Sequence, residues 1–140
     1  MSSFKVFDIA ASGMAAQSVR LNTVASNLAN ANSVSGDKDN VYRARHPVFA
    51  AIAAGAGVAA DASAAAVKVT GIAESQTPAL ARYEPGNPLA DPKGYVYAPN
   101  VNTVEEMVDM ISASRAYQND VEVMNTSKEM MLAVIRLGQS

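Results

Sequence analysis

The chain has 140 residues, enough for one domain, with a net charge of −2 and 49% apolar residues, many of them alanine. This charge excludes the electrostatic footprint of a nucleic-acid-binding protein, and the absence of cysteine excludes disulfides and thiol chemistry. Alanine buries little surface and aromatic residues make up only 6%, so we expect a small core that neighbouring subunits help to stabilise.

Residues 3–30 are predicted to form a first long helix. Large residues recur there every seven positions, and a row of mostly small residues stands three positions before them. The large residues are Phe7, Met14, Leu21 and Leu28, and the row before them is Phe4, Ala11, Ser18 and Ala25. This spacing is typical of a coiled-coil seam whose small positions allow two helices to approach closely. The asparagine- and serine-rich residues from Asn30 onward favour turns and predict the end of the helix.

Residues 36–101 predict a β-rich or irregular insert. Alternating or β-branched stretches are separated by turn residues, and an alanine- and glycine-rich stretch at residues 50–65 predicts a flexible loop or a short helix. The expected strands are residues 41–45, 66–70, 79–83 and 94–97. The first is expected to end near Pro47, and residues 79–83 could pair with residues 66–70.

Residues 102–137 predict a second helix, about 50 Å long at ~1.5 Å per residue, which exceeds what a compact domain of this size needs. Asn102 or Thr103 is placed to cap it, and Gly138 is placed to end it. Glu105 and Glu106 have the spacing of a capping box.

A second heptad pattern runs along this helix. Its alternating a and d positions are Met107, Met110, Ser114, Tyr117, Val121, Met124, Met131 and Ile135. Lys128 interrupts the seam at an a position. The predicted fold is therefore mainly α, with two long terminal helices forming an antiparallel coiled coil and a small β insert between them. It divides into residues 1–35, 36–101 and 102–140.

Specific motifs lie at both ends of the chain. Residues 12–17, SGMAAQ, and 21–33, LNTVASNLANANS, resemble the N-terminal signature of the flagellar rod and hook axial protein family. The later motifs resemble its short proximal-rod members, and they are YEPGNPLADPKGYV at residues 83–96, PNVNTVEEMVDM at 99–110 and SRAYQN at 114–119. The resemblance covers roughly residues 3–35 and 80–137.

This resemblance implies a structural subunit of the proximal rod of the bacterial flagellar basal body. Such a subunit self-assembles through its terminal helices into the drive shaft that transmits motor torque to the hook and encloses the export channel. The implied location is periplasmic, reached through the flagellar type III export apparatus without a cleaved signal peptide. The implied partners are other copies of the chain, other rod proteins and the proteins at the junction of the MS ring and the rod. No nucleic acid, membrane insertion, cofactor or metal is expected.

The candidate assembly residues combine the two seams with polar residues of the motifs. They are Phe7, Met14, Leu21, Asn27, Leu28, Asn30, Asn102, Met107, Met110, Arg115, Tyr117, Val121, Met124 and Met131. The resemblance favours Asn27 and Asn30 as interface hydrogen-bonding residues, and Arg115 and Tyr117 as buried or interface residues. From periodicity alone, an ordinary intramolecular helical hairpin is the simpler interpretation of both seams.

An enzyme is not expected, because the convergent groups of a catalytic site are missing from the sequence. The single histidine, His46, precedes Pro47 in a predicted loop, and no glycine-rich phosphate-binding motif is present. Asp37 and Asp39 lack the remaining ligand positions of a calcium loop. The alternative to a rod subunit is a generic coiled-coil adaptor or a secretion-needle-like assembly subunit.

Overall fold

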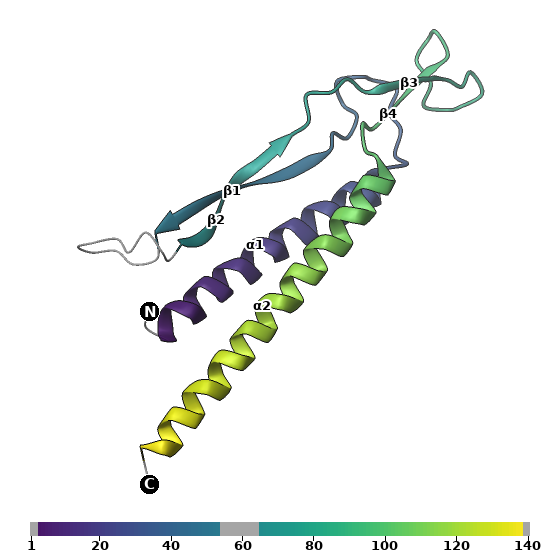
Figure 1. Cartoon of the computed structure of the whole chain (residues 1–140). Coiled ribbons are helices and arrows are strands. Elements are labelled where there is room, and N and C mark those ends of the chain that lie inside the picture. The colour runs from purple at the N-terminus through teal and green to yellow at the C-terminus, as the bar shows by residue number, and fades with distance from the viewer. Residues whose placement is uncertain (1–2, 54–64, 139–140) are drawn as a thin grey trace.

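The computed structural model describes residues 3–53 and 65–138. The loop or short helix expected at residues 50–65 is wrong for residues 50–53 and 65, which belong to strands, and residues 54–64 lie outside the described residues. In chain order the elements are α1 (Ser3–Asn30), β1 (Arg45–Ala53), β2 (Ala65–Glu74), β3 (Leu80–Tyr83), β4 (Tyr95–Ala98) and α2 (Thr103–Leu137). The four strands thus lie between the two long helices in the sequence, which confirms a mainly helical chain with a small β insert (Figure 1).

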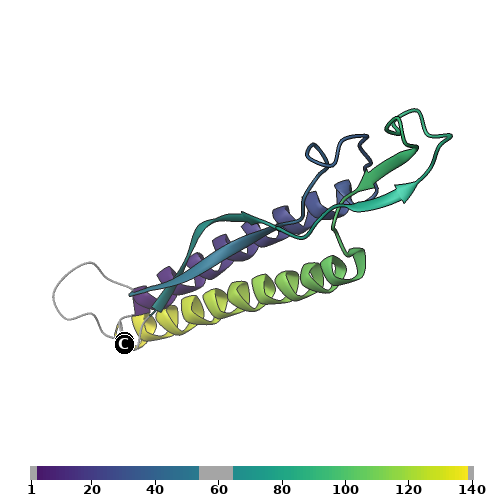
Figure 2. The ribbon, with the colours of Figure 1, turned by 90° about the horizontal axis from the view of Figure 1, so that it is seen from above.

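The two helices lie side by side and run in opposite directions (Figure 1). The β1–β2 hairpin runs along α1, and β3 and β4 lie at the end where α1 stops and α2 starts (Figure 2). Within the described residues α2 packs against α1 alone, whereas α1 also contacts β1 and β2. One long side of α2 therefore remains uncovered.

The ends of both helices match the sequence signals. Asn102 caps α2, and its side-chain oxygen accepts hydrogen bonds from the backbone N–H groups of Val104 and Glu105. Gly138 ends α2, and its N–H donates to the carbonyl of Val134. At the other helix, Ser33 donates from its backbone N–H and its hydroxyl to the carbonyl of Asn30, which closes the turn that follows α1.

The β1–β2 hairpin is antiparallel, with pairs from Arg45 opposite Glu74 to Ala53 opposite Ala65. The prediction that the first strand occupies residues 41–45 and ends near Pro47 is wrong, because β1 begins at Arg45 and continues through the proline. A two-stranded hairpin has two free edges, where the missing N–H of proline breaks no ladder. The register also shifts immediately after Pro47, between Val48 and Phe49.

The strand β3 pairs with β4, from Leu80 opposite Ala98 to Tyr83 opposite Tyr95, so the prediction that residues 79–83 pair with residues 66–70 is wrong. The proline-rich connection between β3 and β4 folds back on itself, which brings these neighbours together. Asp91 organises it by accepting hydrogen bonds from the N–H groups of Lys93 and Tyr95. Bonding to Tyr95 lowers the pKa of the Asp91 carboxyl.

The interior is thin, as the alanine-rich composition predicts. The buried apolar residues are Ala10, Ala16, Val24, Val41, Ala44, Ala66, Val96, Ala98 and Ala113. The largest side chains that are fully buried are Val96 and Asn27. A core of alanine and valine buries little apolar area, so polar contacts have a large share in positioning the helices.

Candidate assembly surface

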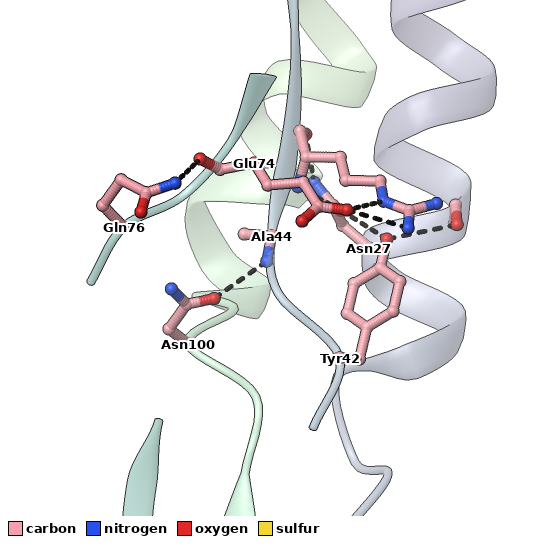
Figure 3. Close-up of polar contacts among 8 residues, drawn as sticks. Asn27, Tyr42, Ala44, Glu74, Gln76 and Asn100 are labelled. Atoms are coloured by element: carbon pink, nitrogen blue, oxygen red, sulfur yellow. Dashed lines mark hydrogen bonds and ion pairs between the residues drawn. The ribbon is translucent and has the colours of Figure 1, made fainter. Parts of the chain in front are cut away.

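Asn27 of α1 is the polar centre of the molecule and is fully buried. Its amide group donates two hydrogen bonds, one to the carbonyl of Arg45 and one to Oε1 of Glu106, and each has a donor–acceptor distance of 2.8 Å. Its oxygen accepts from the Arg45 N–H at 2.9 Å and from the Tyr42 hydroxyl at 2.8 Å (Figure 3). This side chain therefore joins α1 to the start of β1 and to the first turn of α2, and we call these contacts the Asn27 joint.

A second asparagine connects the insert to the segment before α2. The Asn100 oxygen accepts from the Ala44 N–H at 2.8 Å (Figure 3). The Asn100 amide donates to the Thr77 carbonyl at 2.8 Å. Beside it, the Arg45 guanidinium pairs with Glu74 across the open end of the β1–β2 hairpin at 3.0 Å. The residues around Asn27 and Asn100 thus hold both ends of the insert against the helical pair.

The contact between α1 and α2 is made by polar and small residues. Arg20 forms an ion pair with Asp109 at 2.6 Å. Farther along, Gly13 faces Asp120 so closely that a Cβ at Gly13 would stand 2.5 Å from Oδ2. Burial raises the pKa of the Asp120 carboxyl. Asn27, Arg20 and Gly13 contact successively later residues of α2, as an antiparallel pair requires.

The heptad period of the sequence is present, but its phase is displaced by one residue in both helices. The residues of α1 that contact α2 include Gly13, Arg20 and Asn27, each one position before the predicted Met14, Leu21 and Leu28. The inner row of α2 is Glu106, Ala113, Asp120 and Ser127, one position before Met107, Ser114, Val121 and Lys128. One residue is a rotation of about 100° around a helix, so the two rows face different neighbours.

This displacement places the predicted seam residues at the margins or outside of the helical pair. Phe7, Met14, Leu21, Leu28, Asn30, Met110, Val121, Met124 and Met131 are half-buried, and Asn102, Met107, Arg115 and Tyr117 are exposed. The predicted small row is not inside either, because Ala11 and Ala25 are exposed. Lys128 is exposed, so it does not interrupt the inner row, where Ser127 stands instead.

The prediction from residue spacing that Glu106 caps α2 is wrong. The cap is completed by the Asn102 side chain, whereas the Glu106 side chain points inward to Asn27. Arg20, Asp109 and Asp120 were also missed, because a search for apolar rows passes over charged residues. Their signal in the sequence was a seven-residue spacing of small or polar residues beside each apolar row.

The large apolar residues of α2 form two exposed patches. The first patch consists of Val104, Met107, Val108 and Ile111, which are between 55% and 67% exposed and recur as a helical stripe. The second patch, near the end of α2, consists of Met130, Leu132, Val134 and Ile135. Monomeric soluble proteins rarely expose contiguous apolar patches of large extent, so these two indicate contact surfaces.

The second patch lies partly beyond the start of α1. Gly13 faces Asp120, and ten residues toward the start of α1, at Ser3, correspond to ten residues onward in α2, at Met130. Leu132 and the residues after it therefore extend past α1. At this end of the helical pair, Val6 and the α2 residues Ser127, Met130, Met131 and Val134 line a groove of about 310 Å³.

Comparisons with known proteins match both ends of the chain. Residues 7–37 match the family described as flagella basal body rod protein, and residues 93–137 match flagellar basal body rod FlgEFG protein C-terminal. The flagellar basal-body rod protein FlgC of Escherichia coli O157:H7 is 54% identical over 139 residues, which cover 99% of this chain and all of the relative. The chain belongs to the FlgC family of flagellar basal-body rod proteins.

FlgC relatives from other bacteria agree. The protein of Salmonella typhimurium is 52% identical over 99% of this chain and all of its own length. That of Aquifex aeolicus is 43% identical over 92% of each chain. The resemblance to the rod and hook family is thereby confirmed, and membership of this structural family confirms that the chain is not an enzyme.

The two family matches correspond to the two helices. Residues 7–37 comprise most of α1 and the turn after it, and residues 93–137 comprise β4 and α2. The β1–β2 hairpin lies between the matched regions. Features shared with the wider rod family are therefore concentrated in the helical pair that carries the Asn27 joint and the two apolar patches.

In the described part of the chain, no cluster of histidine and acidic side chains is arranged to hold a metal ion. Neither α1 nor α2 combines the length and the hydropathy needed to cross a membrane.

Proposed function

We propose that the chain is a structural subunit of the proximal rod of the flagellar basal body, assembling with neighbouring subunits through the outward side of α2. The observation that carries this proposal is the distribution of residues around α2. Its polar and small residues, Glu106, Ala113 and Asp120, face α1. The large apolar residues of its first patch are more than half exposed, and its half-buried apolar residues lie at the margin of the contact with α1.

This arrangement is the reverse of a self-sufficient helical hairpin, whose apolar residues would face each other. Full burial of a valine, isoleucine or methionine side chain contributes about 1.5–3 kcal/mol. The four residues of the first patch are more than half exposed, so covering them in an assembly supplies a stabilisation that the single chain lacks. The proposed neighbours are other copies of this chain and other rod proteins.

The residues of α2 that were predicted to take part in assembly lie on or beside the proposed assembly surface. Met107 belongs to the first patch, and Tyr117 and Arg115 are exposed farther along α2. Met110, Val121, Met124 and Met131 are half-buried and flank the contact with α1. Methionine adapts its shape to different partners, which suits a subunit that meets non-identical neighbours. Coiled-coil packing in this proposal is formed between subunits.

The finer role follows from the FlgC family. The assembled subunits form a shaft that transmits torque to the hook and encloses the export channel. The subunit reaches the periplasm through the type III export apparatus without a cleaved signal peptide, and it adjoins the proteins where the MS ring meets the rod. The length of α2, about 50 Å at ~1.5 Å per residue, supports an elongated packing element.

The decisive experiment is deletion of the gene in its own bacterium, followed by electron microscopy of purified basal bodies. The deletion strain is expected to keep the MS ring and to lack hook and filament, and the intact gene supplied in trans is expected to restore both. A density map of the complemented basal body should place the chain in the proximal rod. A deletion strain with an intact filament would contradict the proposal and favour a generic coiled-coil adaptor.

A further inference from the structure

The carboxyl group of Glu106 is buried at the Asn27 joint, and one of its two oxygens has no hydrogen-bond partner among the described residues. The residue is 4% exposed. Oε1 accepts from the Asn27 amide at 2.8 Å. Oε2 is buried and has no hydrogen-bond partner within residues 3–53 and 65–138. An ionised carboxylate in this position would bury a charge that one neutral donor only partly offsets.

Asn27 cannot supply a second bond to Glu106. Both protons of its amide are already used, one for the Arg45 carbonyl and one for Oε1 of Glu106. Its oxygen is also occupied, because it accepts from the Arg45 N–H and from the Tyr42 hydroxyl. The joint is therefore complete on the Asn27 side and incomplete at Oε2 of Glu106.

No basic side chain of the described residues forms an ion pair with Glu106. On α1, Arg20 pairs with Asp109 at 2.6 Å. On β1, the Arg45 side chain pairs with Glu74 and lies over the Tyr42 ring. His46, also on β1, is exposed and acts on Glu106 only at a distance.

The net effect of these surroundings favours the neutral acid. Burial raises the pKa of Glu106, the Asn27 bond and His46 act in the opposite direction, and the negative charges of Asp109 and Glu105 raise the pKa further. A buried carboxylate without a paired cation is costly, and a proton removes that cost.

We propose that Glu106 is a proton-controlled latch between α1, α2 and β1, closed when the proton sits on Oε2 and loosened when the carboxyl ionises. In the closed state the neutral acid still accepts the Asn27 hydrogen bond at Oε1. In the ionised state the charge draws the first turn of α2 toward water and away from Asn27. The latch thereby sets how firmly the first patch, which begins at Val104, is held against the rest of the chain.

The direction of the pH dependence follows from proton binding. A carboxyl whose pKa is higher in the folded chain than in the unfolded chain takes up a proton on folding. Its contribution to stability is full below the unfolded pKa and is lost as the pH rises through the folded pKa. The latch therefore predicts a chain that is more stable to unfolding in mild acid than at neutral pH, through Glu106 alone.

The first test is a titration of the full-length wild-type chain, followed by the carbon-13 signal of the Glu106 side-chain carboxyl. The expected midpoint lies above the ordinary glutamate value of 4.5. A midpoint at or below that value would overturn the proposal, since the folded chain would then bind the Glu106 proton no more tightly than the unfolded chain does. This measurement requires no substitution, so it tests the proposed latch even if a variant of Glu106 fails to fold.

The second test compares thermal unfolding of the wild type, Glu106→Gln and Glu105→Gln between mild acid and neutral pH. Glutamine at position 106 keeps the shape of the glutamate side chain and cannot ionise. If Glu106 lowers the unfolding temperature of the wild type as the pH rises, this decrease is expected to be absent in Glu106→Gln. Glu105 is exposed on the same turn, and its variant removes the same charge and is expected to keep the fall. Equal pH slopes in the wild type and Glu106→Gln would overturn the latch and leave the rod function untouched.

Discussion

Gly13 of α1 lies against the Asp120 carboxylate of α2 so closely that a Cβ at position 13 would stand 2.5 Å from Oδ2 and 3.0 Å from Cγ. Glycine inside a helix costs about 1 kcal/mol relative to alanine because it has more freedom to lose on folding. Its presence here is explained by close approach of the two helices.

Gly13→Ala is therefore expected to destabilise the chain despite the better helix propensity of alanine, because Asp120 is half-buried and must move. In an Asp120→Ala background the same substitution is expected to stabilise by about 1 kcal/mol. Unfolding free energies from urea titration of the four variants measure this coupling. An identical effect of Gly13→Ala in both backgrounds would show that the helices are farther apart than described.

Asn27 and Asn30 are both asparagines near the end of α1, and they are expected to differ strongly in their importance. Asn27→Ala leaves the Glu106 carboxyl and the Arg45 backbone without partners, so a loss of about 3 kcal/mol or more is expected. The Asn30 side chain donates only to the Ser26 carbonyl, and Asn30→Ala is expected to cost about 1 kcal/mol or less. Chemical denaturation of the two variants checks this, and equal losses would remove Asn27 from the centre of the fold.

Gly94, immediately before β4, has a backbone φ of +83°, and a Cβ there would stand 2.9 Å from the Tyr83 ring. Gly94→Ala is expected to cost about 1–2 kcal/mol for the left-handed conformation alone. Gly86 in the same connection has nothing within 4 Å of its Cβ position, so Gly86→Ala provides a matched control with little expected effect. Amide exchange of β3 and β4 should report the difference, and a neutral Gly94→Ala would contradict the described turn.

The first patch is expected to matter for assembly and not for the fold of the single chain. Ile111 is 55% exposed, so Ile111→Asp is expected to change the unfolding free energy by only about 0.5 kcal/mol. The same variant is expected to fail to restore swimming in the deletion strain. Ser112→Asp adds the same charge at an exposed position outside the patch and is expected to restore it. Full motility with Ile111→Asp would remove this patch from the assembly surface.

The sequence was informative where local chemistry decides the structure. Asn102 caps a helix because its side chain can reach two free N–H groups, and this depends on its immediate neighbours alone. The bounds of α1 and α2 were predictable for this reason. The pairing of Leu80–Tyr83 was not, because it depends on how the proline-rich connection folds, and Pro47 was misjudged because the free edges of the hairpin were unknown.

The one-residue error in the heptad phase has a different origin. Periodicity reveals that Met107, Val121 and their neighbours share a side of α2, but it does not reveal what covers that side. We assumed that the apolar row of each helix faces the other helix of the same chain. In the structure Glu106, Ala113 and Asp120 take that place, and the apolar residues lie outside or at the margin. A subunit built to be completed by neighbours breaks this assumption.

The register of the two helices also implies a gradient of stiffness along the chain. The hydrogen bond from Asn27 to Glu106 and the ion pair from Arg20 to Asp109 both lie within the first two turns of α2. Toward the other end the helices are separated by the groove beside Val6, and α2 then continues past α1. These two polar contacts thus hold α1 and α2 together at the end where α2 begins. The apolar residues near the end of α2 are not held by these two contacts, which leaves them available to neighbouring subunits in the proposed rod.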